Sequence, residues 1–218
     1  MDDLRTCFSS ADASSNTTPE EQQIWTERNS LIRQDLQTQV MVVRGHDKES
    51  RAILIRMGRT KSQTTEKAFM LAQLYMVERT IAATEVLSKG QQEKLTCVFD
   101  FGDYSSAHAP PFRILRHTVG ILQNIYPERM KKLFILNPPF WMKSAYAMLH
   151  PFLAVDTRTK VNMVSGAAQR ELLLGEWIDA EHATPMMLAD GKLSSATDLE
   201  YFLEQVPFYQ LYDKDNNA

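Results

Sequence analysis

The sequence predicts an α/β fold built on a mixed, largely parallel sheet with crossover helices. Five apolar runs of strand length occur along the chain, and stretches with helical spacing separate the last four of them. Strands that are separated by a helix are joined by crossover connections, which give parallel pairs. The five runs lie at residues 40–43, 52–55, 95–101, 133–136 and 161–164.

The first two runs are expected to form an antiparallel hairpin, because only the polar, turn-rich segment 45–50 joins them. A long helix is predicted at 64–88, where Thr65 can cap the start and Lys89-Gly90 ends it. A packing helix is predicted at 110–126, because its apolar residues recur at steps of three and four. Two later helices are predicted at 167–177 and 197–206.

Composition excludes several classes of protein. The chain has 24 Lys and Arg against 27 Asp and Glu, a net charge of −3, so no overall basic field favours nucleic acid as a partner. Cys7 and Cys97 cannot build a disulfide framework or a paired-thiol metal motif, so both are expected to be reduced thiols. No run approaches the roughly 18 apolar residues of a membrane span, and no signal-peptide pattern opens the chain. We therefore expect a cytoplasmic protein.

One folded domain is expected, because 218 residues at 44% hydrophobic can bury one sizeable core. The Ser/Thr/Asn-rich composition near the N-terminus predicts a disordered leader over residues 1–22 and a folded domain over 23–218. Thr18-Pro19 nevertheless has the pattern of a helix start, with proline in the first turn and acidic residues after it.

The segment 126–161 carries most of the functional information. Asn137-Pro138-Pro139 ends a strand, and a helix can then run over 140–149 before Pro151. Its side chains are apolar almost all round, with Lys143 and Ser144 as the strongly polar exceptions. Such a helix is either buried in the core or faces an apolar partner that is not the core.

The motifs of common enzymes are missing from the sequence. There is no nucleophile elbow, no glycine-rich phosphate or dinucleotide loop and no paired-histidine zinc motif. The five histidines are scattered without ligand spacing. We therefore expect neither catalysis nor a metal or cofactor, although a lipid hydrolase that lacks a recognisable motif remains a third class of function.

Several spaced motifs resemble the CRAL-TRIO lipid-binding family, most of all its branch of fungal phosphatidylinositol and phosphatidylcholine transfer proteins. The resemblance is close over about 95–166 and thinner from about residue 45. In order along the chain, the motifs are Tyr126-Pro127-Glu128-Arg129-Met130, Asn137-x-Pro139, Pro151-Phe152-Leu153 and Thr157-x-x-Lys160.

The resemblance implies an apolar lipid cavity closed by a gate helix at 140–149, and a phospholipid as the bound ligand. The gate and cavity residues would be Phe140, Trp141, Met142, Ala145, Tyr146 and Leu149. It also implies a headgroup site in which Lys160 meets the phosphate, Thr157 donates a hydroxyl, Glu128 accepts from inositol hydroxyls and Arg129 lies alongside. Family members carry an N-terminal three-helix bundle, for which at most one helix is expected here.

The resemblance implies that the protein binds a phospholipid, with phosphatidylinositol as the leading ligand, and exchanges it between membranes as a monomer. One departure weakens the case for phosphatidylinositol, because Leu95 and Cys97 replace two hydroxyl-bearing residues of the central strand. The alternative function is a regulatory module that binds a lipid or another hydrophobic ligand inside a protein assembly. The alternative interpretation of Glu128 and Lys160 is a surface ion pair with no role in binding.

Overall fold

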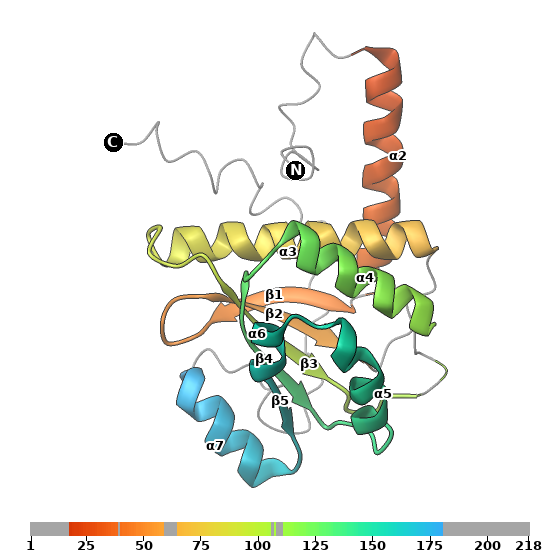
Figure 1. Cartoon of the computed structure of the whole chain (residues 1–218). Coiled ribbons are helices and arrows are strands. Elements are labelled where there is room, and N and C mark those ends of the chain that lie inside the picture. The colour runs from red at the N-terminus through yellow and green to blue at the C-terminus, as the bar shows by residue number, and fades with distance from the viewer. Residues whose placement is uncertain (1–17, 39, 59–64, 106, 108–110, 181–218) are drawn as a thin grey trace.

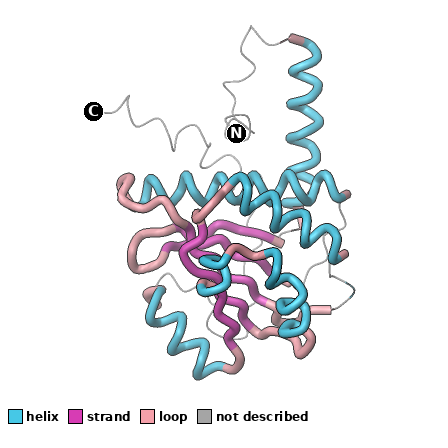
Figure 2. The backbone as a smooth tube through the Cα atoms, viewed as in Figure 1, coloured by secondary structure: helices cyan, strands magenta, loops and turns pink. Residues whose placement is uncertain are grey.

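The computed structural model describes residues 18–38, 40–58, 65–105, 107 and 111–180. The described strands gather into one sheet, drawn in magenta in Figure 2. They follow the order of the sequence, with β1 antiparallel to β2 and every later pair parallel. The strands are β1 (Met41–His46), β2 (Ala52–Met57), β3 (Leu95–Asp100), β4 (Met130–Leu136) and β5 (Val161–Val164). The mixed, largely parallel sheet predicted from the sequence is confirmed.

Helices connect and cover these strands (Figure 1). In the view of Figure 1, α3 crosses above the sheet and the first turns of α2 extend away from it. The helices are α2 (Pro19–Leu36), α3 (Glu66–Leu87), α4 (Phe112–Ile125), α5 (Met142–Leu149), the short 3-10 helix η3 (His150–Phe152), α6 (Val155–Thr159) and α7 (Ala167–Trp177). The helix predicted at 197–206 lies outside the described residues.

Helix α2 begins where the sequence predicted a helix start. The Thr18 hydroxyl accepts from the backbone N–H of Glu21 at 3.3 Å, and the Glu21 carboxylate accepts from the Thr18 N–H at 2.8 Å. This reciprocal capping box satisfies two N–H groups that the first turn would otherwise leave without partners. Residues 19–22 are therefore helical, which corrects the leader boundary at residue 22; residues 1–17 lie outside the described part.

The topology places three successive connections on one face of the sheet. The connections β2–α3–β3, β3–α4–β4 and the one from β4 through α5, η3 and α6 to β5 all join parallel neighbours and advance in the same direction. Right-handed crossovers that advance in one direction all cover the same face. Helix α7, which follows the last strand, packs on the other face, where Leu174 joins Val98 and Phe134 in one buried cluster.

The two halves of the crossover face are buried to different extents. Under α3, the strand residues Leu54, Leu95 and Cys97 are at most 7% exposed and belong to one core cluster. Farther along the sheet, Leu133 of β4 pairs in register with Val161 of β5, and both side chains are only half-buried.

We call the less covered half the α4–β5 apolar surface and define it by four half-buried residues. They are Leu122 on α4, Leu133 on β4, and Val161 and Met163 on β5. Leu122 and Leu133 both pack at the margin of the core cluster under α3. The crossover face therefore carries an incompletely covered apolar area beside a closed core.

Two element boundaries differ from those predicted. Strand β4 begins at Met130 instead of residue 133, because Met130 and Lys132 pair with the start of β3 and tertiary pairing outweighs the polar lysines. Helix α5 begins at Met142 instead of residue 140, because the Met142 N–H donates to the Pro139 carbonyl at 2.8 Å and closes a turn first.

A buried polar cluster centred on Asp47 fixes the β1–β2 hairpin against β3. Asp47 is 1% exposed, and its carboxylate accepts from the Thr96 hydroxyl at 2.8 Å and from the Arg51 guanidinium at 3.2 Å. It also accepts from the backbone N–H groups of Glu49 at 3.0 Å and Arg51 at 2.9 Å. Arg51 is itself 3% exposed, so its charge depends on this partner.

We predict that Asp47→Ala lowers the free energy of unfolding by about 3 kcal/mol or more, because it leaves a buried guanidinium without its buried counter-ion. Urea unfolding followed by circular dichroism measures the loss. Glu49→Ala is the matched control, because Glu49 also pairs with Arg51 but its side chain is 51% exposed, and it should cost about 1 kcal/mol or less. Equal losses in the two variants would contradict a special role for the buried carboxylate.

Candidate functional site

The four predicted headgroup residues lie at one edge of the sheet. Glu128 and Arg129 directly precede β4, Lys160 directly precedes β5, and Thr157 lies in α6 just before it. The strands β3, β4 and β5 are parallel, so their amino ends share an edge. Two backbone hydrogen bonds connect this edge, from the Leu95 N–H to the Arg129 carbonyl at 2.8 Å and from the Leu133 N–H to the Lys160 carbonyl at 3.0 Å. We call it the amino edge.

Glu128 is exposed and has a strained backbone. Its φ of +58° lies in the left-handed region, where the β-carbon of a residue other than glycine crowds the backbone at a cost of about 1–2 kcal/mol. Strain of this kind gathers at functional sites and in tight turns. Its neighbour Arg129 donates to the Glu93 carbonyl at 3.0 Å and lies 3.7 Å from the Glu93 carboxylate, so Arg129 is held toward the chain that precedes β3.

Thr157 and Lys160 belong to the short turn of helix before β5. The Lys160 N–H donates to the Thr157 carbonyl at 3.2 Å, and both residues are half-buried. The Lys160 ammonium forms an ion pair with Asp156, four residues earlier, and its side chain is 13% exposed. The alternative interpretation, a surface ion pair between Glu128 and Lys160, is wrong, because the carboxylate that pairs with Lys160 is that of Asp156.

The two departures on the central strand lie in the core. Leu95 is 4% exposed and Cys97 is 7% exposed, and both pack in the cluster under α3. Burial raises the pKa of the Cys97 thiol to about 12, so it is protonated at neutral pH. Neither side chain supplies a hydroxyl donor, as the sequence indicated.

The helix predicted as a gate is poorly buried. Met142 is 9% exposed, whereas Trp141, Ala145, Tyr146 and Leu149 are half-buried. Phe140, just before the helix, is 96% exposed. Of the two interpretations of an all-round apolar helix, core burial is therefore wrong for most of its length.

Exposed apolar side chains continue from this helix into the next turns. Met148 is 57% exposed, Phe152 on η3 is 41% exposed and Val155 on α6 is 73% exposed. The Arg116 guanidinium lies 4.3 Å from the centre of the Phe152 ring, which connects α4 with η3. We call Phe140, Met148, Phe152 and Val155 together the α5–α6 exposed apolar surface.

The opposite edge of the sheet anchors the start of α5. Asp100, at the end of β3, accepts from the Asn137 side-chain N–H at 2.7 Å and from the Gly102 N–H at 2.9 Å. Two residues past Gly102, the Tyr104 ring lies 5.4 Å from the ring of Trp141. The acidic residue that ends the central strand thus holds the turn from which α5 starts.

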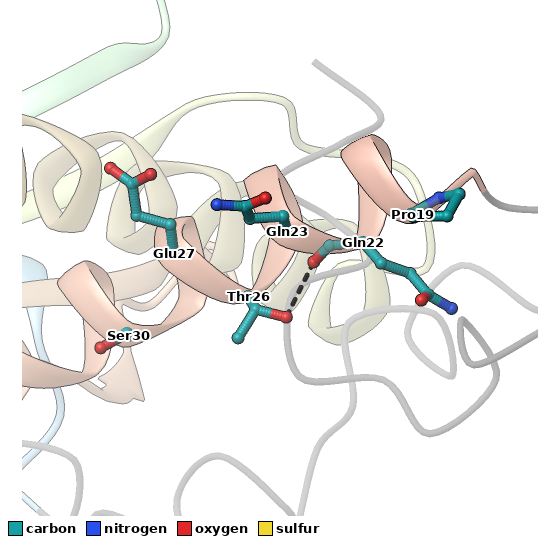
Figure 3. A pocket seen from close by; sticks show the side chains of 6 residues that line it. All are labelled: Pro19, Gln22, Gln23, Thr26, Glu27 and Ser30. Carbon is teal, nitrogen blue, oxygen red and sulfur yellow. Dashed lines mark hydrogen bonds between the residues drawn. The ribbon is translucent and has the colours of Figure 1, made fainter.

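Two surface hollows in the described part of the chain are open to solvent. One, of about 590 Å³, runs along α2 and is shown in Figure 3. It is lined by Pro19, Gln22, Gln23, Thr26, Glu27 and Ser30. The other, of about 140 Å³, lies between the β1–β2 hairpin and the end of α7. Neither hollow is an enclosed apolar cavity, so the lipid cavity that the family resemblance implies stays a prediction.

No helix among the described residues combines the length and apolar character needed to cross a bilayer. No group of three or more His, Cys, Asp or Glu side chains among them is arranged to hold a metal ion.

Comparisons with known proteins identify the family of this chain. The family described as CRAL/TRIO domain matches residues 36–182, which is more than half of the chain. The chain therefore belongs to the CRAL/TRIO domain family, as its motifs suggested.

Relatives and a solved structure agree with this assignment. The chain is 33% identical over 132 residues to a phosphatidylinositol transfer protein, PDR17, of Saccharomyces cerevisiae, covering 57% of this chain and 36% of that protein. It is 38% identical over 68 residues to the SEC14 cytosolic factor of Eremothecium gossypii, covering 31% of this chain and 22% of that protein. The crystal structure of Sfh5 shares the fold with a TM-score of 0.52 at 15% identity, covering 79% of this chain and 68% of that one. The chain thus spans about a third or less of the length of these two curated relatives.

Sequence reasoning missed two residues that touch the predicted site. One is Asp156, although a carboxylate four residues before Lys160 on a helix is at the spacing at which ion pairs form. The other is Tyr104, whose contact with Trp141 joins residues 37 positions apart, for which no local pattern exists.

Proposed function

We propose that the protein binds one phospholipid, with phosphatidylinositol as the leading ligand, and exchanges it with membranes without breaking a covalent bond. The observation that carries this proposal is an amphipathic arrangement in a member of the CRAL/TRIO domain family. Polar and charged candidates occupy the amino edge, and the half-buried α4–β5 apolar surface extends from that edge along β4 and β5. The name of PDR17 supports a phosphatidylinositol ligand.

The energetics of lipid transfer explain why both parts are needed. Removing acyl chains from water is worth about 0.8 kcal/mol per methylene, or roughly 25 kcal/mol for some thirty methylenes. A bilayer gives the same gain, so the apolar surface makes transfer nearly balanced but does not select a lipid. Selection between lipids has to come from polar contacts with the headgroup.

The headgroup roles follow from the chemistry of the residues at the amino edge. Lys160 is a cation with little exposure and suits a phosphate. Thr157, half-buried beside it, can donate a hydroxyl, and the exposed carboxylate of Glu128 can accept from inositol hydroxyls. Arg129 can add a second positive charge if it leaves Glu93.

An alternative function is a regulatory module that binds a lipid or another hydrophobic ligand inside a protein assembly without transferring it. The buried Leu95 and Cys97 favour this alternative, because they remove two hydroxyls from the central strand. Transfer of labelled lipid between two vesicle populations separates the two functions, since the module would bind lipid without moving it.

We predict that Lys160→Ala loses bound phosphatidylinositol selectively. The loss of a charge-assisted contact to a phosphate should reduce occupancy roughly tenfold, because such contacts are stronger than neutral hydrogen bonds. Native mass spectrometry after incubation with vesicles of phosphatidylcholine and phosphatidylinositol measures the bound species.

Lys48→Ala is the control for the loss of one lysine. Its ammonium bonds the Gly175 carbonyl at 2.6 Å, on the side of the sheet that α7 covers, and it should leave the bound lipid unchanged. If Lys160→Ala carries the same lipids as the wild type, Lys160 is not part of the headgroup site. If the wild-type protein carries no phospholipid, the proposed function is overturned.

Membrane contact is assigned in this proposal to the α5–α6 exposed apolar surface. Aromatic and aliphatic side chains with neighbouring cations are the composition of segments that lie in the membrane interface. Phe140, Met148, Phe152 and Val155 supply the apolar part, and the exposed Lys143 supplies a cation. A cytoplasmic monomer that visits membranes transiently fits this composition.

We predict that Trp141 changes its environment at a membrane. In a Trp25→Phe, Trp177→Phe variant, the fluorescence of Trp141 should shift to shorter wavelength on adding vesicles of phosphatidylcholine and phosphatidylserine, because the ring leaves Tyr104 and enters the interface. Phe140→Ala in the same background should weaken the vesicle interaction. A spectrum that is insensitive to vesicles would contradict a mobile α5.

A further inference from the structure

In the structure, the ammonium of Lys160 pairs with the Asp156 carboxylate. The proposed function assigns this same ammonium to the lipid phosphate. Helix α6 has five residues, with Asp156 in its first turn, and Lys160 follows its last residue. The Asp156 carboxylate accepts from the Lys160 ammonium at close contact. The lysine side chain is 13% exposed and the aspartate side chain is 56% exposed, so the lysine is the enclosed partner and the aspartate is the one facing water.

A headgroup phosphate and the Asp156 carboxylate cannot both approach this ammonium without repelling each other. Like charges held within a few ångströms of each other repel strongly at the effective dielectric near a protein surface. Asp156 is held to α6 by its backbone, whose carbonyl accepts from the Thr159 hydroxyl at 2.8 Å. A displaced Asp156 side chain therefore remains within one helical turn of the bound headgroup.

The other cation of this helix does not relieve the competition. The Arg158 guanidinium donates through Nε to the Leu153 carbonyl at 3.0 Å, at the turn before α6. The Arg158 carbonyl in turn lies 3.4 Å from the Tyr146 hydroxyl of α5. Arg158 thus connects α6 to the preceding turn and to α5, while Asp156 and Lys160 pair with each other.

We propose that Asp156 determines headgroup specificity, as a built-in counter-ion that competes with the lipid phosphate for Lys160. This inference rests on the proposed function of the amino edge. Because its charge stays near the site, Asp156 disfavours a headgroup with net negative charge, such as inositol phosphate. A zwitterionic headgroup, such as phosphocholine, is disfavoured less, because its cation offsets the negative charge of the Asp156 carboxylate. Asp156 therefore limits the preference for phosphatidylinositol over phosphatidylcholine.

The test uses Asp156→Asn, which keeps the size of the side chain and removes its charge. Wild type and variant are incubated with vesicles of phosphatidylcholine and phosphatidylinositol, and the bound lipids are compared by native mass spectrometry. The ratio of bound phosphatidylinositol to phosphatidylcholine should rise about twofold to fivefold, the range expected for a partly exposed ion pair.

Two controls separate this effect from a general change of charge. Asp179→Asn removes a carboxylate that is also 56% exposed and lies 3.8 Å from the Lys48 ammonium, and it should leave the ratio unchanged. In a Lys160→Ala background, Asp156→Asn should give a smaller gain, because only the direct repulsion between Asp156 and the headgroup is then removed and there is no ammonium left to compete for.

Each outcome bears on one of the two claims or on both. An unchanged or lower ratio in Asp156→Asn, with phospholipid on the wild type, overturns the role of Asp156 and leaves the proposed function standing. A gain of the same size in the Lys160→Ala background also overturns it, because the effect would then not depend on Lys160. Phosphatidylinositol bound by Asp156→Asn but not by wild type supports it. If no variant carries phospholipid, the proposed function falls and this inference falls with it.

Discussion

Burial of strand β3 on both faces is the constraint on which the rest of the structure depends. Its side chains alternate between the cluster under α3, which holds Leu95 and Cys97, and the cluster under α7, which holds Val98. A parallel strand needs a crossover to reach each neighbour, and crossovers that advance in one direction cover one face. The closed core under α3 and the order of the sheet together determine where α4, α5 and α6 lie.

That arrangement separates a stable half from an adaptable half. The half under α3 is closed by buried apolar side chains and by hydrogen bonds such as the one from the Tyr126 hydroxyl to Glu78 at 2.7 Å. The half over β4 and β5 keeps Leu133 and Val161 half-buried, under helices whose own apolar residues are incompletely covered. Elements with few buried contacts open at low free-energy cost. A protein that takes up and releases a ligand needs such a region beside a core that does not move.

The sequence predicted the sheet and most of its helices because hydrophobic periodicity and capping residues act locally. Thr18 and Thr65 both cap helices where expected. The leader boundary at residue 22 was wrong because the capping box of Thr18 and Glu21 starts helix α2 at Pro19, as the Thr18-Pro19 pattern had indicated. The start of β4 was missed because pairing with β3 recruits Met130 and two lysines that have no strand pattern of their own. The location of the four predicted headgroup residues at one edge follows from parallel pairing, and the ion pair of Lys160 with Asp156 follows from their spacing of four residues on a helix.

The most informative experiment is photo-crosslinking with phosphatidylcholine that carries a photoactivatable group near the end of one acyl chain. Peptides from α4, β4 and β5 should be labelled, with Leu122, Leu133, Val161 or Met163 as the modified residues. Labelling confined to α7 or to the open hollow along α2, with those three elements unmodified, would contradict the proposal that the α4–β5 apolar surface holds the acyl chains.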